Sequence, residues 1–215
     1  MTDVYFVHIY GTSLAADALL AAVEPVLKKS RLAVLHVPVA LPGADPLPVD
    51  QDERLLLLQL AGSEMAGEVD SVARRIMGVS EVTHQAMACE RITPGGPDDP
   101  HSRPTAVSWW VQYNGPAKDP AAFHAYYRAH HLPIVHRMPG IRSLNLYLPQ
   151  PWTPPAGVQS VDHLQLVQAM FDHLDGLLAM RASRQRKQGL KDFENYPSFE
   201  GPVTHQAMNS RRITP

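Results

Sequence analysis

Cysteine is almost absent from this chain of 215 residues: Cys89 is the single one, so no disulfide can form within the chain. This usage fits a reducing compartment, and we expect a cytoplasmic protein. An excess of one charge sign is also missing, because 19 Lys and Arg against 21 Asp and Glu give a formal net charge of −2. Nucleic acid and anionic membranes are therefore not expected as partners.

Long apolar runs are missing too, since none approaches the ~20 residues that a membrane-spanning helix needs. The first residues, MTDVYFVHIYG, have neither the basic start nor the small-residue cleavage site of a signal peptide. Hydrophobic residues nevertheless make up 45 % of the chain. That is enough for the core of one domain or of two small ones, and we expect a soluble intracellular protein.

Motifs for metals and nucleotides are absent as well. The sequence has no His-Glu-x-x-His, no Cys/His cluster, no Gly-x-Ser-x-Gly and no Gly-rich phosphate loop. His130, His131 and His136 lie close together, but with eleven histidines in the chain such spacing arises easily by chance. We predict no metal site and no cofactor.

A repeat is present instead. The sequence VTHQAM occurs at 82–87 and again at 203–208, and an Ile-Thr-Pro ending follows at Ile92 and at Ile213. Both pairs are separated by 121 residues (203 − 82 and 213 − 92). Six identical residues with a matched ending predict a tandem duplication.

Each half has the pattern of a β-α-β-β-α-β unit. In the first half, strands are predicted at Val4–Tyr10, Leu32–Val39, Arg54–Ala61 and Val79–Arg91, and helices at Leu14–Lys29 and Ser63–Met77. In the second half, strands are predicted at Ala106–Tyr113, Ile141–Leu148, Asp162–Ala169 and Val203–Ile213, and helices at Pro120–Arg137 and His173–Gln188. This is the ferredoxin-like order in duplicate, so we predict an α+β fold of two tandem ferredoxin-like repeats.

The domain boundaries follow from composition. Residues 1–94 form the first repeat, the Pro- and Gly-rich residues 95–104 are a linker, and residues 105–215 form the second repeat. A four-stranded sheet with helices on one face needs cover on the other, and two repeats can cover each other. We therefore predict an intramolecular pseudo-dimer that forms one barrel, with further pairing into a homodimer left open. The irregular residues 149–157 could form a loop over a pocket, with Trp152 as a lid residue or as simple packing.

The segment from Asp119 to Gly140 draws attention as a candidate site. Asp119 followed by Pro120 predicts a helix start. Pro133 lies inside the helical pattern, where it donates no hydrogen bond to the carbonyl near Ala129. The helix is therefore expected to bend or end beside His130 and His131.

One face of this helix is mainly apolar but carries phenol and imidazole groups. At ~100° per residue, a narrow arc contains Phe123, Tyr127, His130 and Ile134, with Tyr126 and His131 on its shoulders. An ordinary amphipathic core helix would also explain this pattern. Ideal geometry alone favours His130 as the residue that faces inward.

The same segment resembles a known signature. The run Phe123-x-x-Tyr126-Tyr127-x-x-x-His131-Leu132-Pro133-x-Val135, followed by Met138-Pro139-Gly140-Ile141, is similar to that of EthD-like proteins, which belong to the dimeric α+β barrel superfamily. The resemblance implies that the histidine two residues before the proline, His131, is the functional one. We follow the resemblance, because ideal angles are unreliable so close to a proline.

The first helix of the first half contains no histidine, no tyrosine and no His-x-Pro. We therefore expect one site per chain, in the C-terminal half. His205 shares a strand face with Val203 and Ala207 and is a second catalytic candidate. The equivalent position in the first half is also a histidine, His84, which favours a structural role equally well.

Further residues are candidates for binding a substrate. On the strand 107–113, Trp109, Val111 and Tyr113 share one face, which is the better core face, and Ser108, Trp110 and Gln112 share the other. Trp110 is either a pocket wall for a flat ligand or packing. Asn145 could orient a carbonyl or lie on a solvated strand. The substrate-binding candidates are Trp110, Tyr113, Tyr126, Tyr127 and Asn145, whereas the basic residues Arg181, Arg184, Arg186 and Lys187 are expected on a solvated helix face.

The resemblance implies chemistry on small aromatic or polyketide-like carbonyl compounds, by isomerases, cyclases, decarboxylases, C–C lyases or monooxygenases. Proton transfer is what the available side chains can supply. We predict a cofactor-independent lyase or isomerase with His131 and His205 as catalytic residues. The alternatives are a non-catalytic binding protein for a hydrophobic metabolite and a cofactor-free or haem-binding oxygenase.

Overall fold

Eight antiparallel strands close into a barrel in the computed structural model, which describes residues 2–29, 33–42, 50–51, 54–92 and 105–213. The linker predicted at 95–104 lies outside these residues. The N-terminal half contributes β1 (Thr2–Gly11), β2 (Ala33–Pro38), β4 (Arg54–Leu60) and β5 (Val79–Arg91). The C-terminal half contributes β6 (Val107–Tyr113), β7 (Ser143–Pro149), β8 (Gln165–Phe171) and β9 (Val203–Ile213). The predicted α+β class is confirmed, and β5 and β9 have the predicted bounds.

Two seams join the halves into the closed ring. The strand order is β2-β4-β1-β5-β7-β8-β6-β9, and β2 pairs with β9 to complete it. At one seam β5 pairs with β7 over Met87–Arg91, and at the other β2 pairs with β9 over Ala33–Pro38. A closed ring leaves no long sheet edge open for pairing with other chains. The short strand β3 (Asp50–Gln51) pairs in parallel with the start of β9.

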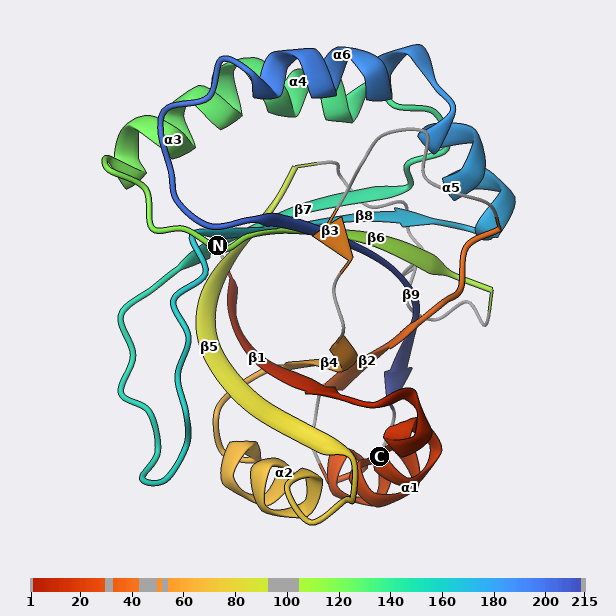
Figure 1. The fold of residues 1–215 in the computed structure, drawn as a ribbon, viewed down its shortest axis with the longest axis vertical. Coiled ribbons are helices and arrows are strands. Elements are labelled where there is room, and N and C mark those ends of the chain that lie inside the picture. The colour runs from red at the N-terminus through yellow and green to blue at the C-terminus, as the bar shows by residue number, and fades with distance from the viewer. Residues whose placement is uncertain (1, 30–32, 43–49, 52–53, 93–104, 214–215) are drawn as a thin grey trace.

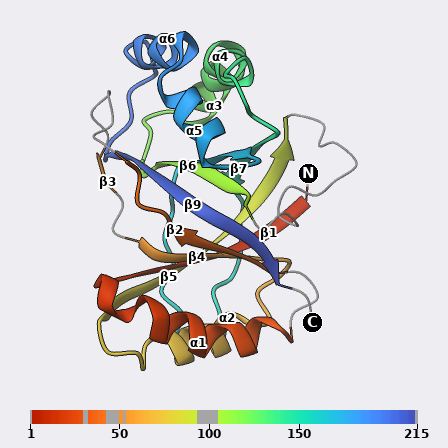
Figure 2. The ribbon, with the colours of Figure 1, turned by 90° about the vertical axis from the view of Figure 1, so that its right-hand side faces the viewer.

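The helices lie outside the barrel on two opposite sides (Figures 1 and 2). The N-terminal half is covered by η1 (Ser13–Ala15), α1 (Ala16–Leu27) and α2 (Ala66–Ala73). The C-terminal half is covered by α3 (Pro120–Tyr126), η3 (Tyr127–His131), α4 (Leu132–His136), α5 (Leu174–Arg181) and α6 (Arg184–Phe193). The single helix predicted at 173–188 is two helices. Ser183 has extended backbone angles, and its Oγ accepts the N–H of Arg186, so a new helix begins there.

Successive residues of each strand face opposite sides of the barrel wall. On β1, Tyr5, Val7 and Ile9 pack beneath the N-terminal helices, whereas Val4 and Phe6 point inward. The interior cluster consists of Val4, Phe6, Leu57, Met87, Trp110, Tyr147, Leu166 and Met208. The barrel is therefore filled by side chains, and space for a ligand has to be sought on its outer faces.

The segment between β7 and β8 runs back along the outside of β5 (Figure 1). The N–H of His84 donates to the carbonyl of Gln159 at 2.9 Å, and the N–H of Val161 donates to the carbonyl of His84 at 3.0 Å. Trp152 packs edge-on against Tyr5, with ring centroids 5.2 Å apart. Trp152 therefore packs on the N-terminal half, and with Gln150 and Thr153 it also lines a pocket there.

Among the described residues, no helix combines the length and the hydrophobicity that crossing a bilayer requires. The cytoplasmic location expected from the sequence stays a prediction.

Trp110 should be a main contributor to stability. Its side chain is 2 % exposed and contacts Phe6, Tyr147 and His36 in the interior. Replacing a buried Trp with Ala typically costs about 3–5 kcal/mol, so we expect Trp110→Ala to lower the free energy of unfolding by that amount in denaturant titrations. Leu14→Ala is the control, because Leu14 is 93 % exposed and should change stability by less than ~0.5 kcal/mol. Equal effects of the two changes would contradict this account of the interior.

Candidate active site

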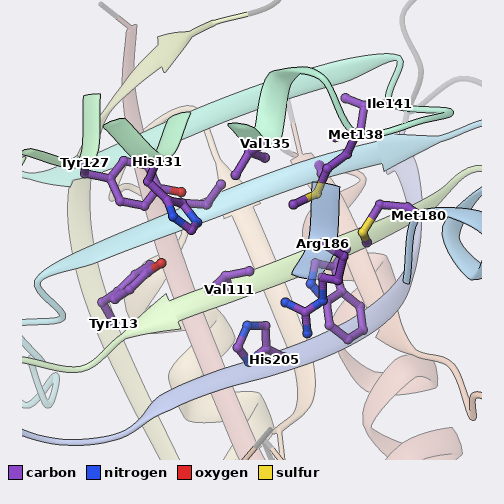
Figure 3. A pocket seen from close by; sticks show the side chains of 13 residues that line it. Val111, Tyr113, Tyr127, His131, Val135, Met138, Ile141, Met180, Arg186 and His205 are labelled. Atoms are coloured by element: carbon purple, nitrogen blue, oxygen red, sulfur yellow. The ribbon is translucent and has the colours of Figure 1, made fainter. Parts of the chain in front are cut away.

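A pocket lies between the outer face of the C-terminal sheet and its helices (Figure 3). Its lining consists of Trp109, Val111, Tyr113, Tyr127, His131, Val135, Met138, Ile141, Val167, Ala169, Met180, Arg186 and His205. The cavity volume is about 50 Å³, several times the space that one water molecule needs. The pocket is mainly apolar but carries two imidazoles, two phenols and one guanidinium.

The helix wall of this pocket changes its winding beside the histidines. Asp119 caps the start of α3, where its Oδ1 accepts the N–H of Ala122 at 2.9 Å. At Tyr127–His131 the helix becomes a π-helix, and the N–H of Leu132 donates to the carbonyl of Tyr127, five residues back. Pro133 follows at once and has no N–H to donate. The irregularity expected beside the histidines therefore takes the form of a π turn, a feature that often occurs at functional sites.

The π turn decides which histidine faces the pocket. Because a π-helix has more residues per turn than an α-helix, residues four apart fall on the same face of the helix. Tyr127, His131 and Val135 therefore all line the pocket. His130 is exposed, and its ring lies against that of Tyr126 with centroids 4.5 Å apart. Ideal α-helical geometry pointed to His130 because it assumes ~100° per residue throughout.

His131 is held by a carboxylate from another helix. Its Nδ1 lies 2.9 Å from Asp192 Oδ2 on α6, and Asp192 Oδ1 accepts the hydroxyl of Tyr126 at 3.0 Å. Since a carboxylate only accepts, it assigns the proton of the neutral ring to Nδ1 and leaves a lone pair on Nε2. Burial lowers the pKa of His131 more than Asp192 raises it. The ring is therefore uncharged near pH 7 and can accept a proton there.

Helix α6 approaches this ring closely. Gly189 on α6 is buried, and a Cβ there would lie 3.4 Å from Cε1 of His131 and 3.5 Å from the methyl carbon of Met138. An alanine would therefore make ordinary van der Waals contact there, whereas a side chain longer than alanine would push α6 away from His131. Such a shift would lengthen the contact between His131 and Asp192.

His205 faces the pocket from the sheet wall. Its ring lies 5.5 Å from that of Trp109, and its Nδ1 is buried without a hydrogen-bond partner among the described residues. Burial lowers the pKa of His205 to about 3, and the charge of Arg186 contributes. His205 is therefore neutral at all ordinary pH values.

The equivalent histidine of the first half is in a different state. His84 is fully buried, with Nδ1 3.1 Å from the hydroxyl of Tyr5 and Nε2 3.1 Å from Asp70 Oδ1. Both ring nitrogens are satisfied, as expected for a structural histidine. The histidines of the two VTHQAM copies thus differ. Both ring nitrogens of His84 contact protein groups, whereas Nδ1 of His205 has no hydrogen-bond partner among the described residues and the ring lines a pocket.

Three residues at this site were missed from the sequence. Arg186 lines the pocket with its guanidinium 5.7 Å from the Trp109 ring centre, so the expected solvated position was wrong for it. It was also wrong for Arg181, which is buried. Asp192 and Tyr196 come from the same C-terminal region, and Tyr196 packs edge-on against His131 at 5.2 Å. The break at Ser183, which begins α6, was the signal that could have pointed to this helix.

The buried phenols remain donors. Burial raises the pKa of Tyr113 to about 12. It also raises the pKa values of Tyr127 and Tyr196 above the ordinary value. These hydroxyls are therefore protonated near neutral pH and can donate hydrogen bonds to an electron-rich oxygen of a ligand.

Residues 115–199 match the family model described as the EthD domain. This stretch of the chain is an EthD domain. It contains the π turn, His131, Arg186 and Asp192, whereas His205 lies after it on β9. The search of curated proteins found no match.

Solved structures share the whole fold at low sequence identity. A candidate monooxygenase from Fusobacterium nucleatum has a TM-score of 0.61 and 8 % identity, covering 99 % of this chain and 93 % of its own. An anthrone oxidase-like protein has a TM-score of 0.60 and 12 % identity, covering 98 % and 92 %. A candidate monooxygenase from Lactobacillus acidophilus has a TM-score of 0.54 and 8 % identity, covering 100 % and 95 %. At such identities the likeness concerns the α+β barrel fold alone.

The expected site residues do not all meet in the EthD domain pocket. His131, His205, Tyr113 and Tyr127 line it together. Tyr126 lies behind His131 and reaches Asp192. Trp110 and Asn145 lie on the other side of the barrel wall: Trp110 packs in the interior, and the Asn145 amide donates to Gln168 Oε1 at 3.1 Å.

The low pKa of His205 predicts a pH-dependent cost of stability. The unfolded chain binds a proton at this ring near pH 6.5 and the folded chain near pH 3, so stability due to His205 is lost as pH falls through 6.5. Between pH 7.5 and 5, the wild type should lose about 2 kcal/mol of unfolding free energy relative to His205→Gln, by denaturant titration. If the unfolding free energies of the two proteins changed with pH in parallel, the folded and unfolded chains would bind the proton equally well. The ring would then be in contact with water and not buried.

Proposed function

We propose that this protein is an enzyme that transfers a proton next to the carbonyl of a small aromatic or polyketide-like compound. It acts without a cofactor, as a lyase or an isomerase. The contact of 2.9 Å between His131 Nδ1 and Asp192 Oδ2 carries this proposal, because it leaves Nε2 as a base inside a mainly apolar pocket (Figure 3).

In this reaction His131 removes a proton from the carbon beside the carbonyl, and the electron pair moves onto the carbonyl oxygen to form an enolate. The protonated hydroxyls of Tyr113 and Tyr127 are the donors available to that oxygen. Return of the proton from His131 to a different carbon completes an isomerisation. In a decarboxylation, His131 first takes the proton of the substrate's carboxylic acid. Loss of carbon dioxide then leaves the electron pair on carbon, and return of that proton from His131 to the carbon completes the reaction.

An oxygenase is the second candidate. It is favoured by the fold shared with candidate monooxygenases and an anthrone oxidase-like protein. The first step would be the same proton removal by His131. The carbanion would then transfer one electron to molecular oxygen and combine with it to form a peroxide. Loss of water from the protonated peroxide would leave a new carbonyl group. Consumption of oxygen in step with substrate loss would favour this candidate over the lyase or isomerase.

A haem-dependent version does not suit the site as it stands. The cavity of about 50 Å³ is far too small for a tetrapyrrole, which is several times the size of a single aromatic ring. No step of the proposed reaction is therefore assigned to haem.

A non-catalytic role uses the same pocket differently. A binding protein for a hydrophobic metabolite would use the histidines only as hydrogen-bond partners. A stoichiometric ligand that stays bound through purification, together with no turnover of compounds resembling it, would favour this role.

The two neighbouring histidines provide a matched test. Enolisable aromatic keto acids and lactones are screened in metal-free buffer, and the rate is followed for each variant. His131→Asn should lower turnover ~100-fold or more, because Asn cannot accept a proton near pH 7. His130→Asn should retain turnover, because His130 is exposed on the other side of the π turn. Both variants should unfold within ~1–2 kcal/mol of the wild type.

Asp192→Asn extends the same test. An amide can donate to Nδ1 of His131 and so favour the tautomer with its proton on Nε2, which abolishes the base on the pocket side. Turnover should fall at all pH values. Normal turnover in both His131→Asn and Asp192→Asn would remove this helix from the chemistry, and loss of wild-type activity on adding a chelator would also count against the proposal.

We further propose that the chain is a tandem duplication whose halves form an intramolecular pseudo-dimer of ferredoxin-like units. Support comes from the repeated VTHQAM motif and from strand orders with the same connectivity, β2-β4-β1-β5 and β7-β8-β6-β9. The first unit would then serve as the second wall of the barrel, and no second chain would be needed to close it.

Residues 1–94 expressed alone test the pseudo-dimer. Without the second half, the inward face that carries Val4, Phe6, Leu57 and Met87 would be open to water. We expect this fragment to aggregate or to self-associate, as measured by size-exclusion chromatography with light scattering. A monomer with a cooperative melt would contradict the proposal.

A further inference from the structure

The charges at the EthD domain pocket are of one sign. Among its thirteen lining residues none is Asp or Glu, and Arg186 is the one Lys or Arg. The nearby carboxylate of Asp192 does not line the pocket, because it lies behind His131 and accepts hydrogen bonds from that ring and from Tyr126. The pocket therefore presents a positive wall in mainly apolar surroundings, where charge interactions are strong.

A second polar atom lies on the same wall, and it is a donor in the tautomer of the neutral ring that carries its proton on Nδ1. Nδ1 of His205 is buried and has no hydrogen-bond partner among the described residues. A buried polar atom without a partner costs free energy, which a ligand atom can recover. Figure 3 shows Arg186 and His205 close to each other on one side of the pocket, with His131 across from them.

An aromatic surface joins these two groups. The Trp109 ring lies 5.5 Å from the His205 ring and 5.7 Å from the Arg186 guanidinium carbon. A planar ring that bears a carboxylate matches this arrangement, because a guanidinium binds a carboxylate through two parallel hydrogen bonds. A neutral analogue of the same shape would lose the charge-assisted part of this contact.

We propose that the substrate is an aromatic acid whose carboxylate binds to Arg186 and His205 while its reacting carbon faces His131. This inference rests on the proposed function for the role of His131, but the carboxylate contact is separable from it. It makes Arg186 a residue that determines specificity, and it distinguishes acids from neutral lactones and ketones as ligands.

The test compares benzoate with benzamide, which have nearly the same shape and differ in charge. Binding of each probe to the full-length protein at neutral pH is measured by calorimetry. Wild type should bind benzoate at least ~10-fold more tightly than benzamide. Arg186→Gln should reduce this preference to within about two-fold. Arg184→Gln is the matched control, because it removes the same charge from an exposed position of the same helix, and it should keep the preference.

The outcomes separate this inference from the proposed function. No preference for benzoate in the wild type, no binding of benzoate, or a preference that survives in Arg186→Gln would overturn the carboxylate site. His131→Asn should bind benzoate as the wild type does, even though its turnover is lost. The wild-type comparison needs no variant, so it decides the matter even if Arg186→Gln fails to fold.

Discussion

The backbone hydrogen bonds at the two seams, between β5 and β7 and between β2 and β9, are the constraint on which the rest of the structure depends. They convert two four-stranded sheets into one ring, so that every strand has an inner and an outer face. The inner faces meet and fill with side chains such as Phe6 and Trp110. Helices and the pocket can therefore occupy only the outer faces, and the pocket lies where the EthD domain helices leave a gap above the sheet.

Much of this architecture could be predicted from the sequence. Alternating apolar residues and the repeated VTHQAM motif located both long final strands, β5 and β9, with their bounds. Closure of the ring was expected because each sheet needs cover. The division at Ser183 was not expected, because the run from 173 to 188 has no proline and its one glycine, Gly176, does not lie at the division. A single side-chain cap to the N–H of Arg186 is enough to start a new helix there.

The candidate site was harder to predict, because it depends on how one helix winds and how another lies over it. Pro133 indicated an irregularity beside the histidines, but periodicity cannot say that it is a π turn, and a shift by one residue exchanges His130 for His131. The contact of His131 with Asp192 joins residues 61 apart in sequence, so no local pattern contains it. Trp110 was difficult for a different reason. The residues that share its strand face could be identified from the sequence, but which of the two faces lines the pocket depends on how the whole barrel closes.

The contrast between His84 and His205 shows how equal sequence can lead to unequal chemistry. Both occupy the same place in a repeated motif, yet Asp70 and Tyr5 close the first, whereas the second meets a pocket beside Arg186. The difference comes from the side chains around each ring: Asp70 on α2 and Tyr5 on β1 close His84, whereas Nδ1 of His205 has no hydrogen-bond partner among the described residues. One half can therefore keep its motif for packing while the other places it at a candidate site.

The alternation of the barrel wall separates two kinds of variation along a single strand. Trp109 and Trp110 are neighbours in the chain, yet one lines the pocket and the other fills the interior. The outward positions of β6 and β9 belong to the core beneath the C-terminal helices and border the candidate pocket, whereas the positions between them fill the barrel interior. A strand organised in this way places two neighbouring residues under separate constraints, one from the helix-covered face and one from the barrel interior.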